Sequence, residues 1–191
     1  TGKAVSAGNL HTCAIRSDDT LWCWGYDGPA LGDGEPASIS RLVPWQVVGG
    51  HTWKAVAAGG NSTCAIRSDD TLWCWGAGNV GSLGNGDTSN SYVPVAVSGG
   101  LEWRGVAHGH LHGCGIDVDD SLWCWGYGTY GQLGVDGSGN SLIPLAVDGD
   151  DEWNAVTTGV HHTCGIHADD ASLWCWGYTF TGFEQIETDA P

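Results

Sequence analysis

One motif occurs four times in this sequence: a strand-like run with a cysteine at its centre, a polar turn, and the pentapeptide Leu-Trp-Cys-Trp-Gly. The copies are 51, 50 and 51 residues apart, measured between Trp24, Trp75, Trp125 and Trp176. A repeat period of about 50 residues is typical of propeller blades and solenoid units. The sequence therefore predicts an array of similar small units that pack on one another.

Each copy predicts a β-hairpin, because two runs of strand-prone residues flank a loop of Ser, Asp and Thr. If the strands of the first copy pair around Asp18, then Cys13 faces Cys23 and Ile15 faces Leu21. The Cβ atoms of directly opposed antiparallel residues lie about 4.5–5.5 Å apart, slightly farther than a disulfide prefers. The expected site of a disulfide is therefore the closer, non-hydrogen-bonded type of pair.

The cysteine pattern indicates disulfides and an oxidising, extracellular or cell-surface location. Zinc binding is the alternative, but zinc sites usually carry cysteine pairs about two to four residues apart. Here the partners are ten residues apart in three copies and eleven in the last. The expected pairs are Cys13 with Cys23, Cys64 with Cys74, Cys114 with Cys124, and Cys164 with Cys175.

Each unit is expected to hold about four short antiparallel strands, so the predicted fold class is all-β with blades of the β-propeller type. A first strand such as 53–56 is followed by a glycine turn, the cysteine hairpin, a glycine-rich loop and a strand that starts with proline. Proline is tolerated at a strand start, because its missing N–H lies at the edge of the ladder. The expected units are blade repeats 1–52, 53–102 and 103–152, a partial blade repeat 153–177, and a non-repeat aromatic and acidic tail 178–191.

The last unit departs from the pattern, because no Gly-x-Leu-Gly loop and no proline-led strand follow Gly177. In their place, the segment 178–183 alternates in a strand-like way. This segment either pairs with an exposed sheet edge or is a frayed terminus. Its aromatic residues, Tyr178, Phe180 and Phe183, are the candidates for self-assembly.

Charged residues are few and mostly acidic: six Lys and Arg stand against 22 Asp and Glu, for a net charge of −16. Such a surface repels phosphate backbones, so no nucleic-acid partner is expected. It suits an extracellular protein, or one that holds cations in its loops. The sequence has no apolar run of roughly 18 residues, so no membrane span is expected.

Three histidines, His108, His110 and His112, alternate along the chain. On one strand their side chains would share a face, and three imidazoles on one face can bind a transition metal. The alternative is a structural role, because His112 occupies a repeat position where the first and fourth copies also have histidine. The structural role is favoured, and no metal site is assigned.

Glycine-rich loops at 33–35, 85–87 and 136–140 carry Asp, Asn and Glu oxygens. Such loops can hold Ca²⁺, but their spacing does not match an EF-hand, and the same residues are ordinary in solvated turns. Ca²⁺ is therefore the only cofactor considered, and none is assigned. The sequence contains no nucleophile–base–orienter set, no zinc-protease motif and no phosphate loop, so no enzymatic activity is expected.

Paired tryptophans recur in every copy, as Trp22 and Trp24 do on either side of Cys23. Both members of a pair project to the same sheet face, because they lie two residues apart. Packing of this face between blades is the favoured interpretation. Carbohydrate stacking and electron hopping along tryptophan rows are the alternatives. Trp45, which has no counterpart in the other units, is the better candidate for an exposed contact.

Four sequence elements together resemble the repeat of the regulator of chromosome condensation family: Ala-Gly-x-x-His-Thr-x-Ala-Ile, Leu-Trp-x-Trp-Gly, Gly-Gln-Leu-Gly and Pro-x-x-Val. The resemblance extends to about Gly177. Within the family, the chain is similar to the secreted bacterial branch, in which cysteines sit on the two hairpin strands. It implies a β-propeller of four-stranded blades, usually seven of them. The family spans a nuclear exchange factor for a small GTPase, a plant UV-B photoreceptor and a secreted inhibitor of β-lactamases, so fold alone does not give function.

The residues and charge of this chain give little support to any of these three functions. Disulfides and the acidic charge argue against a nuclear, chromatin-bound protein. The photoreceptor places tryptophans directly after the glycine that precedes the His-Thr pair. The residues at those positions here are Asn9, Gly60, His110 and Val160, so the chromophore cluster is not matched. The inhibitor uses aromatic-rich loops on one propeller face, and no local motif identifies such a surface.

Four units do not make a seven-blade ring, and three explanations remain open. The chain is part of a longer propeller, it closes as a four-blade form or an eight-blade pair, or its open ends join head to tail. The predicted function is an extracellular, non-enzymatic scaffold that binds a protein or glycan partner. The alternative is a structural subunit whose copies polymerise into an extracellular filament through incomplete terminal blades.

Overall fold

The computed structural model describes residues 1–26, 28–36, 40–137, 139–149, 152–178 and 184–186. Within these ranges the protein is all-β, with two short 3-10 turns, η1 (Pro29–Leu31) and η2 (Asn79–Gly81). The strands form four separate four-stranded antiparallel sheets. Each sheet is one blade, and its strands lie side by side in chain order. The predicted fold class is confirmed.

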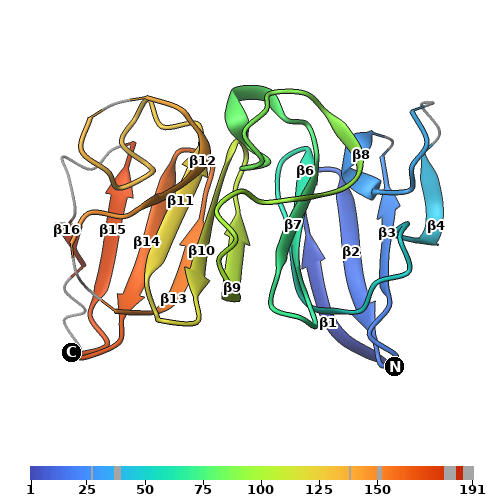
Figure 1. Ribbon diagram of the computed structural model, residues 1–191, viewed down its shortest axis with the longest axis horizontal. Helices are drawn as coiled ribbons and strands as arrows, with labels where there is room; N and C mark the ends of the chain where they lie inside the picture. Colours follow the sequence, from blue (N-terminus) through green and yellow to red (C-terminus); the bar gives the residue numbers. More distant parts are fainter. Residues whose placement is uncertain (27, 37–39, 138, 150–151, 179–183, 187–191) are drawn as a thin grey trace.

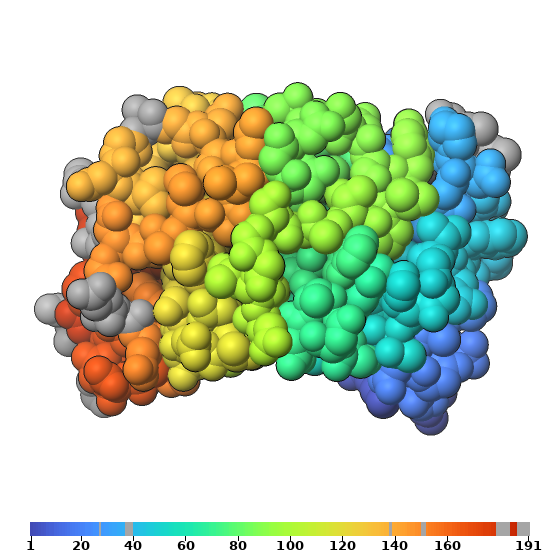
Figure 2. Space-filling view, viewed as in Figure 1, coloured from blue at the N-terminus to red at the C-terminus, as the bar shows by residue number. Residues whose placement is uncertain are grey.

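The four blades follow one another across the molecule from blue to red (Figure 1). Figure 2 shows the same order on the surface, with blades 1 and 4 at the two ends of the row. Blade 1 contains β1 (Gly2–Ala7), β2 (His11–Arg16), β3 (Leu21–Gly25) and β4 (Arg41–Gln46). Blade 2 contains β5 (Trp53–Ala58), β6 (Ser62–Arg67), β7 (Leu72–Gly76) and β8 (Ser91–Ala96). Blade 3 contains β9 (Trp103–His108), β10 (His112–Asp117), β11 (Leu122–Gly126) and β12 (Ser141–Ala146), and blade 4 contains β13 (Trp153–Thr158), β14 (His162–His167), β15 (Leu173–Gly177) and β16 (Glu184–Gln185).

The hairpin register expected from the sequence is confirmed, since Cys13 pairs with Cys23 and Ile15 with Leu21. The turn is fixed locally: the Asp18 carboxylate accepts hydrogen bonds from the backbone N–H and the hydroxyl of Thr20, at 3.2 and 2.6 Å. Asp19 then adopts a left-handed φ of 64°. Asp tolerates this conformation better than most residues, which explains the Asp-Asp pair at the tip of the hairpin.

All four cysteine pairs form disulfides across their own hairpins. The Cα atoms of each pair lie 4.1 Å apart, as suits the closer type of antiparallel pair. Cys13 and Cys23 are fully buried, and so are their counterparts in blades 2 and 3. The disulfides are therefore part of the core as well as crosslinks of the chain.

The core lies between blades and repeats three times. We call the side of a blade that carries both cysteines, the isoleucine and the leucine its disulfide face. We call the opposite side, which carries the paired tryptophans, its tryptophan face. In each interface, the disulfide face of one blade packs on the tryptophan face of the next, which confirms the favoured interpretation for the paired tryptophans of blades 2, 3 and 4. Between blades 1 and 2 the buried residues are Cys13, Ile15, Leu21, Cys23, Leu31 and Val47 on one side and Trp53, Ala65 and Trp75 on the other. Between blades 2 and 3, Trp103 and Trp125 fill the same places, and between blades 3 and 4, Trp153 and Trp176 do so.

Blade 4 ends with a short strand after Gly177. The two-residue strand β16 pairs with β15, with Cys175 opposite Glu184, so the fourth sheet includes part of the segment 178–191. Tyr178 is described and is 56% exposed. Phe180 and Phe183, the other self-assembly candidates, lie outside the described residues. No helix in the described ranges has the length and apolar character needed to cross a membrane.

Candidate functional site

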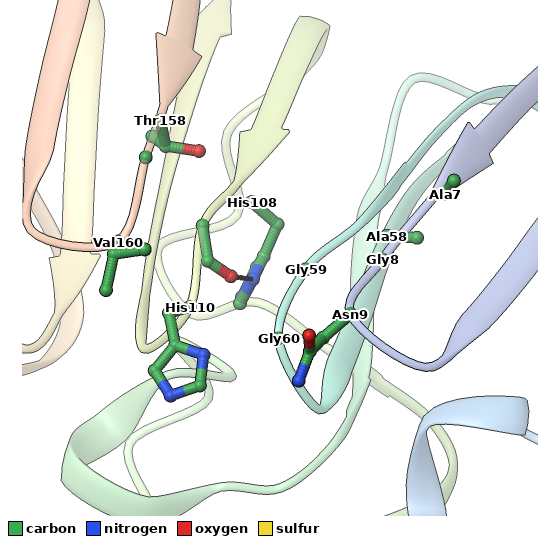
Figure 3. Close-up of a pocket in the computed structure, with 12 residues that line it drawn as sticks. Ala7, Gly8, Asn9, Ala58, Gly59, Gly60, His108, His110, Thr158 and Val160 are labelled. Carbon is green, nitrogen blue, oxygen red and sulfur yellow. Dashed lines mark hydrogen bonds between the residues drawn. The ribbon is translucent and has the colours of Figure 1, made fainter. Parts of the chain in front are cut away.

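The glycine turns that end the first strand of each blade surround one axial pocket of about 390 Å³. Figure 3 shows the turns of blades 1 and 4 on opposite sides of this pocket. Four of its lining residues occupy one repeat position: Asn9, Gly60, His110 and Val160. The four blades therefore curve around a common axis.

Backbone hydrogen bonds link each axial turn to the next. Asn9 N–H donates to Gly59 O at 3.0 Å, and Gly60 N–H donates to Gly109 O at 2.9 Å. His110 N–H donates to Gly159 O at 3.3 Å. A Cβ atom on Gly59 would lie 2.3 Å from Gly109 O, so this close approach requires glycine.

Buried histidines link one blade to the next by a hydrogen bond to a threonine hydroxyl, and we call each such pair a clamp. His11 Nε2 lies 2.8 Å from the Thr63 hydroxyl, which itself donates to Ala30 O at 2.8 Å. Because the hydroxyl proton is used by that carbonyl, His11 Nε2 is the donor. His112 repeats the clamp with Thr163 at 2.9 Å, and Thr163 donates to Gln132 O at 2.8 Å. Both bonds cross from one blade to the next.

Blade 2 lacks the clamp residue and uses a substitute. Ser62 stands at the histidine position, and Gly113 stands at the threonine position of blade 3. His108, from the end of β9, fills the interface: its Nε2 donates to Ser82 O at 2.9 Å, and its Nδ1 lies 3.4 Å from the Ser62 hydroxyl. Gly113 is needed because a Cβ there would meet the Trp125 ring at 2.6 Å.

The clamp histidines are held neutral. Burial, with a smaller contribution from His108, lowers the pKa of His11 to about 4. Burial likewise lowers the pKa of His112 to about 3, with smaller contributions from His108, His161 and His162. Burial also lowers the pKa of His108. At neutral pH these imidazoles serve as hydrogen-bonding groups, each with one protonated nitrogen.

The structure separates the three histidines that the sequence offered as metal candidates. His108 ends β9, His110 lies in the turn, and His112 begins β10, so they do not share one strand face. His108 points toward blade 2 and His112 toward blade 4, as their bonds to Ser82 and Thr163 show. Among the described residues, no group of three His, Cys, Asp or Glu side chains is placed to hold a metal ion.

Two of the three oxygen-rich loops considered for Ca²⁺ use a carboxylate in internal contacts. The Asp33 carboxylate accepts from Arg41 Nε at 2.8 Å. The Asp87 carboxylate accepts from the backbone N–H groups of Thr88 and Ser89, at 2.6 and 3.2 Å. The pKa of Asp87 is lowered by these same backbone hydrogen bonds. The Asp87 bonds are those of an ordinary Asx turn, and the Asp33 bond belongs to an ion pair with Arg41.

An aromatic cluster lies between blades 3 and 4, and one of its members, His161, directly follows the pocket residue Val160. Its centre is Tyr130, whose ring centroid is 5.0 Å from those of Tyr178 and His161 and 5.8 Å from that of Tyr127. Gln132 Oε1 accepts from Tyr130 N–H at 2.9 Å and so fixes the loop. Tyr130 and Tyr178 are 43% and 56% exposed. We call Tyr127, Tyr130, His161 and Tyr178 the tyrosine cluster.

Sequence reasoning missed this cluster and named only Tyr178 from it. A signal was present, because Tyr26, Tyr127 and Tyr178 directly follow the Trp-Gly of their hairpins. Exposed tyrosine rings offer flat apolar area with a polar hydroxyl at the edge. Such surfaces stack on sugar rings or pack against protein side chains.

Comparison with known proteins places these features in a family. The regulator of chromosome condensation (RCC1) repeat matches residues 69–116 and 119–166, and a second description of the same repeat matches residues 3–28 and 53–82. The chain is 34% identical over 96 residues to the ultraviolet-B receptor UVR8 of Arabidopsis thaliana, covering 48% of this chain and 21% of the receptor. It is 31% identical over 94 residues to the human E3 ubiquitin-protein ligase HERC2, covering 47% of this chain and 2% of the ligase.

Solved structures show the same fold. Yeast RCC1 (Prp20), solved bound to Kap60, superposes with a TM-score of 0.85 at 18% identity, over 99% of this chain and 49% of that chain. Human WBSCR16 superposes with a TM-score of 0.82 at 20% identity, over 93% of this chain and 48% of that chain. The chain thus spans about half the length of these propellers. With both the repeat sequence and the blade architecture matched, the chain belongs to the regulator of chromosome condensation (RCC1) repeat family.

Proposed function

We propose that this chain is an extracellular, non-enzymatic propeller scaffold that binds a glycan or protein partner at the tyrosine cluster. The observation that carries the proposal is the group of partly exposed rings that meet between blades 3 and 4. A rigid frame supports these rings, because interblade hydrogen bonds and buried tryptophans fix blades 3 and 4 relative to each other. Aromatic residues on a rigid support bind with little loss of conformational entropy.

The extracellular location is supported by the four disulfides and by the acidic surface. The absence of enzymatic activity is supported by the use of the buried histidines. His11, His108 and His112 bond to neighbouring blades, and the buried Thr63 and Thr163 hydroxyls that His11 and His112 contact already donate to backbone carbonyls.

A glycan array probed with fluorescently labelled protein tests the first partner class. We expect wild-type protein to be retained by one class of glycan, and the double variant Tyr130→Ala/Tyr178→Ala to lose at least tenfold in affinity. Tyr26→Ala is the matched control, because Tyr26 has the same repeat position and is 65% exposed but lies on blade 1.

If the array retains no protein, the same three proteins are immobilised and exposed to proteins secreted by the source cells. A partner captured by wild type and by Tyr26→Ala, but not by the double variant, supports a protein ligand. Equal capture by all three proteins would contradict the proposed site.

A second candidate function is structural, with copies joining head to tail through the faces of blades 1 and 4. The observation that favours it is the exposure of apolar residues on these faces, among them Val5 at 72% and Ile166 at 36%. A junction that does not close on itself produces the extracellular filament. Electron microscopy of the native protein shows such filaments if they form.

A further inference from the structure

Arg67 is a half-buried cation in blade 2 that no carboxylate pairs with among the described residues. It ends β6, and its Cζ lies 3.5 Å from the ring centroid of Trp73 and 5.5 Å from that of Trp53. Its buried Nε has no hydrogen-bond partner in the part of the chain that the structure describes. A guanidinium carries five N–H donors in a rigid fork. The two indole rings therefore hold in place a set of donors that the protein itself does not use.

This unpaired state is an exception in an acidic chain. The sequence has 22 Asp and Glu against six Lys and Arg, so carboxylate partners are plentiful. Of the other five basic side chains, Arg16 is exposed, and the remaining four each form an ion pair. The pairs are Lys3 with Asp19, Arg41 with Asp33, Lys54 with Asp70, and Arg104 with Asp120.

The carboxylates closest to Arg67 in sequence are engaged by other partners. Asp69 Oδ1 accepts from the backbone N–H and the hydroxyl of Thr71, at 3.2 and 2.6 Å. Asp70 pairs with Lys54. Burial lowers the pKa of Arg67, and the charge of Asp69 opposes this effect only in part. The charge of Arg67 is therefore incompletely compensated, and a bound anion would compensate it.

An open pocket of about 280 Å³ lies beside this guanidinium. Two short segments line it: the residues before β5 and the residues that end β6, namely His51, Thr52, Arg67, Ser68 and Asp69. Ser68 N–H donates to Thr52 O at 3.0 Å, which fixes the two segments relative to each other. The Ser68 and Thr52 hydroxyls add short polar groups to the lining. The pocket is therefore formed before any ligand arrives.

His51 forms an uncharged wall of the pocket. Its ring is nearly parallel to that of Trp73, with an interplanar angle of 23° and centroids 6.2 Å apart. Burial, and then the charge of Arg67, lower the pKa of His51 below 6.5, so the ring is neutral at pH 7. The charged lining groups are then the Arg67 guanidinium and the Asp69 carboxylate.

This charge balance favours a ligand group with a single negative charge. The cost of removing an ion from water rises with the square of its charge, whereas its interaction with the pocket rises only linearly. A dianion such as sulfate therefore gains less than a monoanion where one carboxylate offsets one guanidinium. A carboxylate also matches the fork of an arginine, because its two oxygens can accept two parallel N–H bonds.

The other blades do not repeat this arrangement. The residues at the position of Arg67 are Arg16, Asp117 and His167. Asp117 is buried, and its carboxylate accepts from Trp123 Nε1 at 2.9 Å and from two backbone N–H groups of its own hairpin. The His167 ring stacks on the first tryptophan of its own hairpin, with centroids 5.4 Å apart. The repeat therefore does not require an arginine at this position for folding.

We propose that this pocket binds one carboxylate group of a small ligand, with Arg67 as the bidentate donor. Such a group occurs in uronic-acid sugars and in small organic acids. The pocket lies at the tip of the β6–β7 hairpin, whereas Tyr127 and Tyr178 follow the opposite ends of their hairpins. It is thus a second site, and it does not rest on the function proposed for the tyrosine cluster.

Nuclear magnetic resonance of protein labelled with ¹⁵N at tryptophan tests the proposal, because the Trp73 indole N–H reports on the pocket. This group donates to the Thr71 hydroxyl at 2.9 Å. The Trp22 indole donates in the same way to Thr20 at 2.8 Å and serves as an internal control. The probes are sodium glucuronate and sodium propionate, with glucose and sodium sulfate as comparisons, all at an ionic strength of about 0.15 M.

We expect both carboxylates to shift the Trp73 signal saturably, and more than that of Trp22, whereas glucose should not. Tighter binding of glucuronate than of propionate assigns the carboxylate to an acidic sugar, and equal or weaker binding assigns it to a small organic acid. Arg67→Lys keeps the charge but lacks the fork, so it should weaken binding at least fivefold, and Arg67→Gln should abolish it. Arg16→Gln is the matched control, because Arg16 has the same repeat position but is exposed.

Circular dichroism and the mass of the non-reduced protein establish that each variant is folded and oxidised. The proposal is overturned if neither carboxylate shifts the Trp73 signal saturably up to tens of millimolar, or if Arg67→Gln binds as wild type does. It is also overturned if sulfate binds as tightly as the carboxylates, or if Arg16→Gln weakens binding as much as Arg67→Gln. None of these results bears on the tyrosine cluster, which the Tyr130 and Tyr178 variants test independently.

Discussion

Mild acid is expected to destabilise this protein through its clamp histidines. His11 and His112 have an ordinary pKa of 6.5, which burial lowers to about 4 and about 3 in the folded state. The unfolded state therefore binds more protons than the folded state as the pH falls below 6.5. Stability is fully present above that value and is lost as the pH decreases toward the folded pKa.

The size of the effect at pH 5 does not depend on the folded pKa values, because both lie below that pH. A ring that is neutral when folded and has a pKa of 6.5 when unfolded costs about 2 kcal/mol between pH 7 and pH 5. His11 and His112 together therefore cost about 4 kcal/mol, and His108 acts in the same direction. This is a large part of the roughly 5–15 kcal/mol that stabilises a typical domain.

Denaturant unfolding at pH 7 and pH 5 with intact disulfides measures this loss. This pH range lies above the range in which carboxylates such as Asp18 titrate, because hydrogen bonds from Thr20 lower the Asp18 pKa below 3.8. The control is the double variant His11→Gln/His112→Gln, which we expect to be less stable at pH 7 but to lose much less stability on acidification. Equal free energies of unfolding for wild type at the two pH values would refute the argument that these histidines are buried and neutral.

Three further tests examine other parts of the frame. Thr163→Val is expected to cost about 2 kcal/mol in thermal or denaturant unfolding, because it leaves a buried His112 nitrogen without its acceptor; no change would show that water or a rearranged side chain replaces the hydroxyl. Gly59→Ala is expected to cost at least about 3 kcal/mol, because its Cβ would lie 2.3 Å from a backbone oxygen. Gly28→Ala, with nothing within 4 Å, should be nearly neutral, and equal effects would contradict the close approach at the axis. The double variant Cys114→Ala/Cys124→Ala is expected to lose about 3 kcal/mol from the unfolded-state constraint alone; wild-type stability under oxidising conditions would count against that account.

The repeated local chemistry made much of the fold predictable. The Leu-Trp-Cys-Trp-Gly strand and the Asp-Asp turn set the register within each hairpin, so the pairing of Cys13 with Cys23 followed from counting residues. The alternation of cysteine and tryptophan then assigned opposite faces to the disulfides and the indoles. Both features depend on contacts between residues close in sequence, which is why they could be predicted.

Contacts between blades were harder to predict from the sequence. The His11 clamp reaches Thr63, 52 residues away, and no local pattern shows that the two side chains meet. The replacement of this clamp by His108 depends on the simultaneous presence of Ser62 and Gly113, which only the folded arrangement connects. The tyrosine cluster likewise joins a loop of blade 3 to a turn and a strand end of blade 4.

The glycan array with its matched variants tests most directly whether the tyrosine cluster is the binding surface. The account predicts that wild type and Tyr26→Ala bind the same class of glycan, and that Tyr130→Ala/Tyr178→Ala loses at least tenfold in affinity. Equal binding by all three proteins would contradict it.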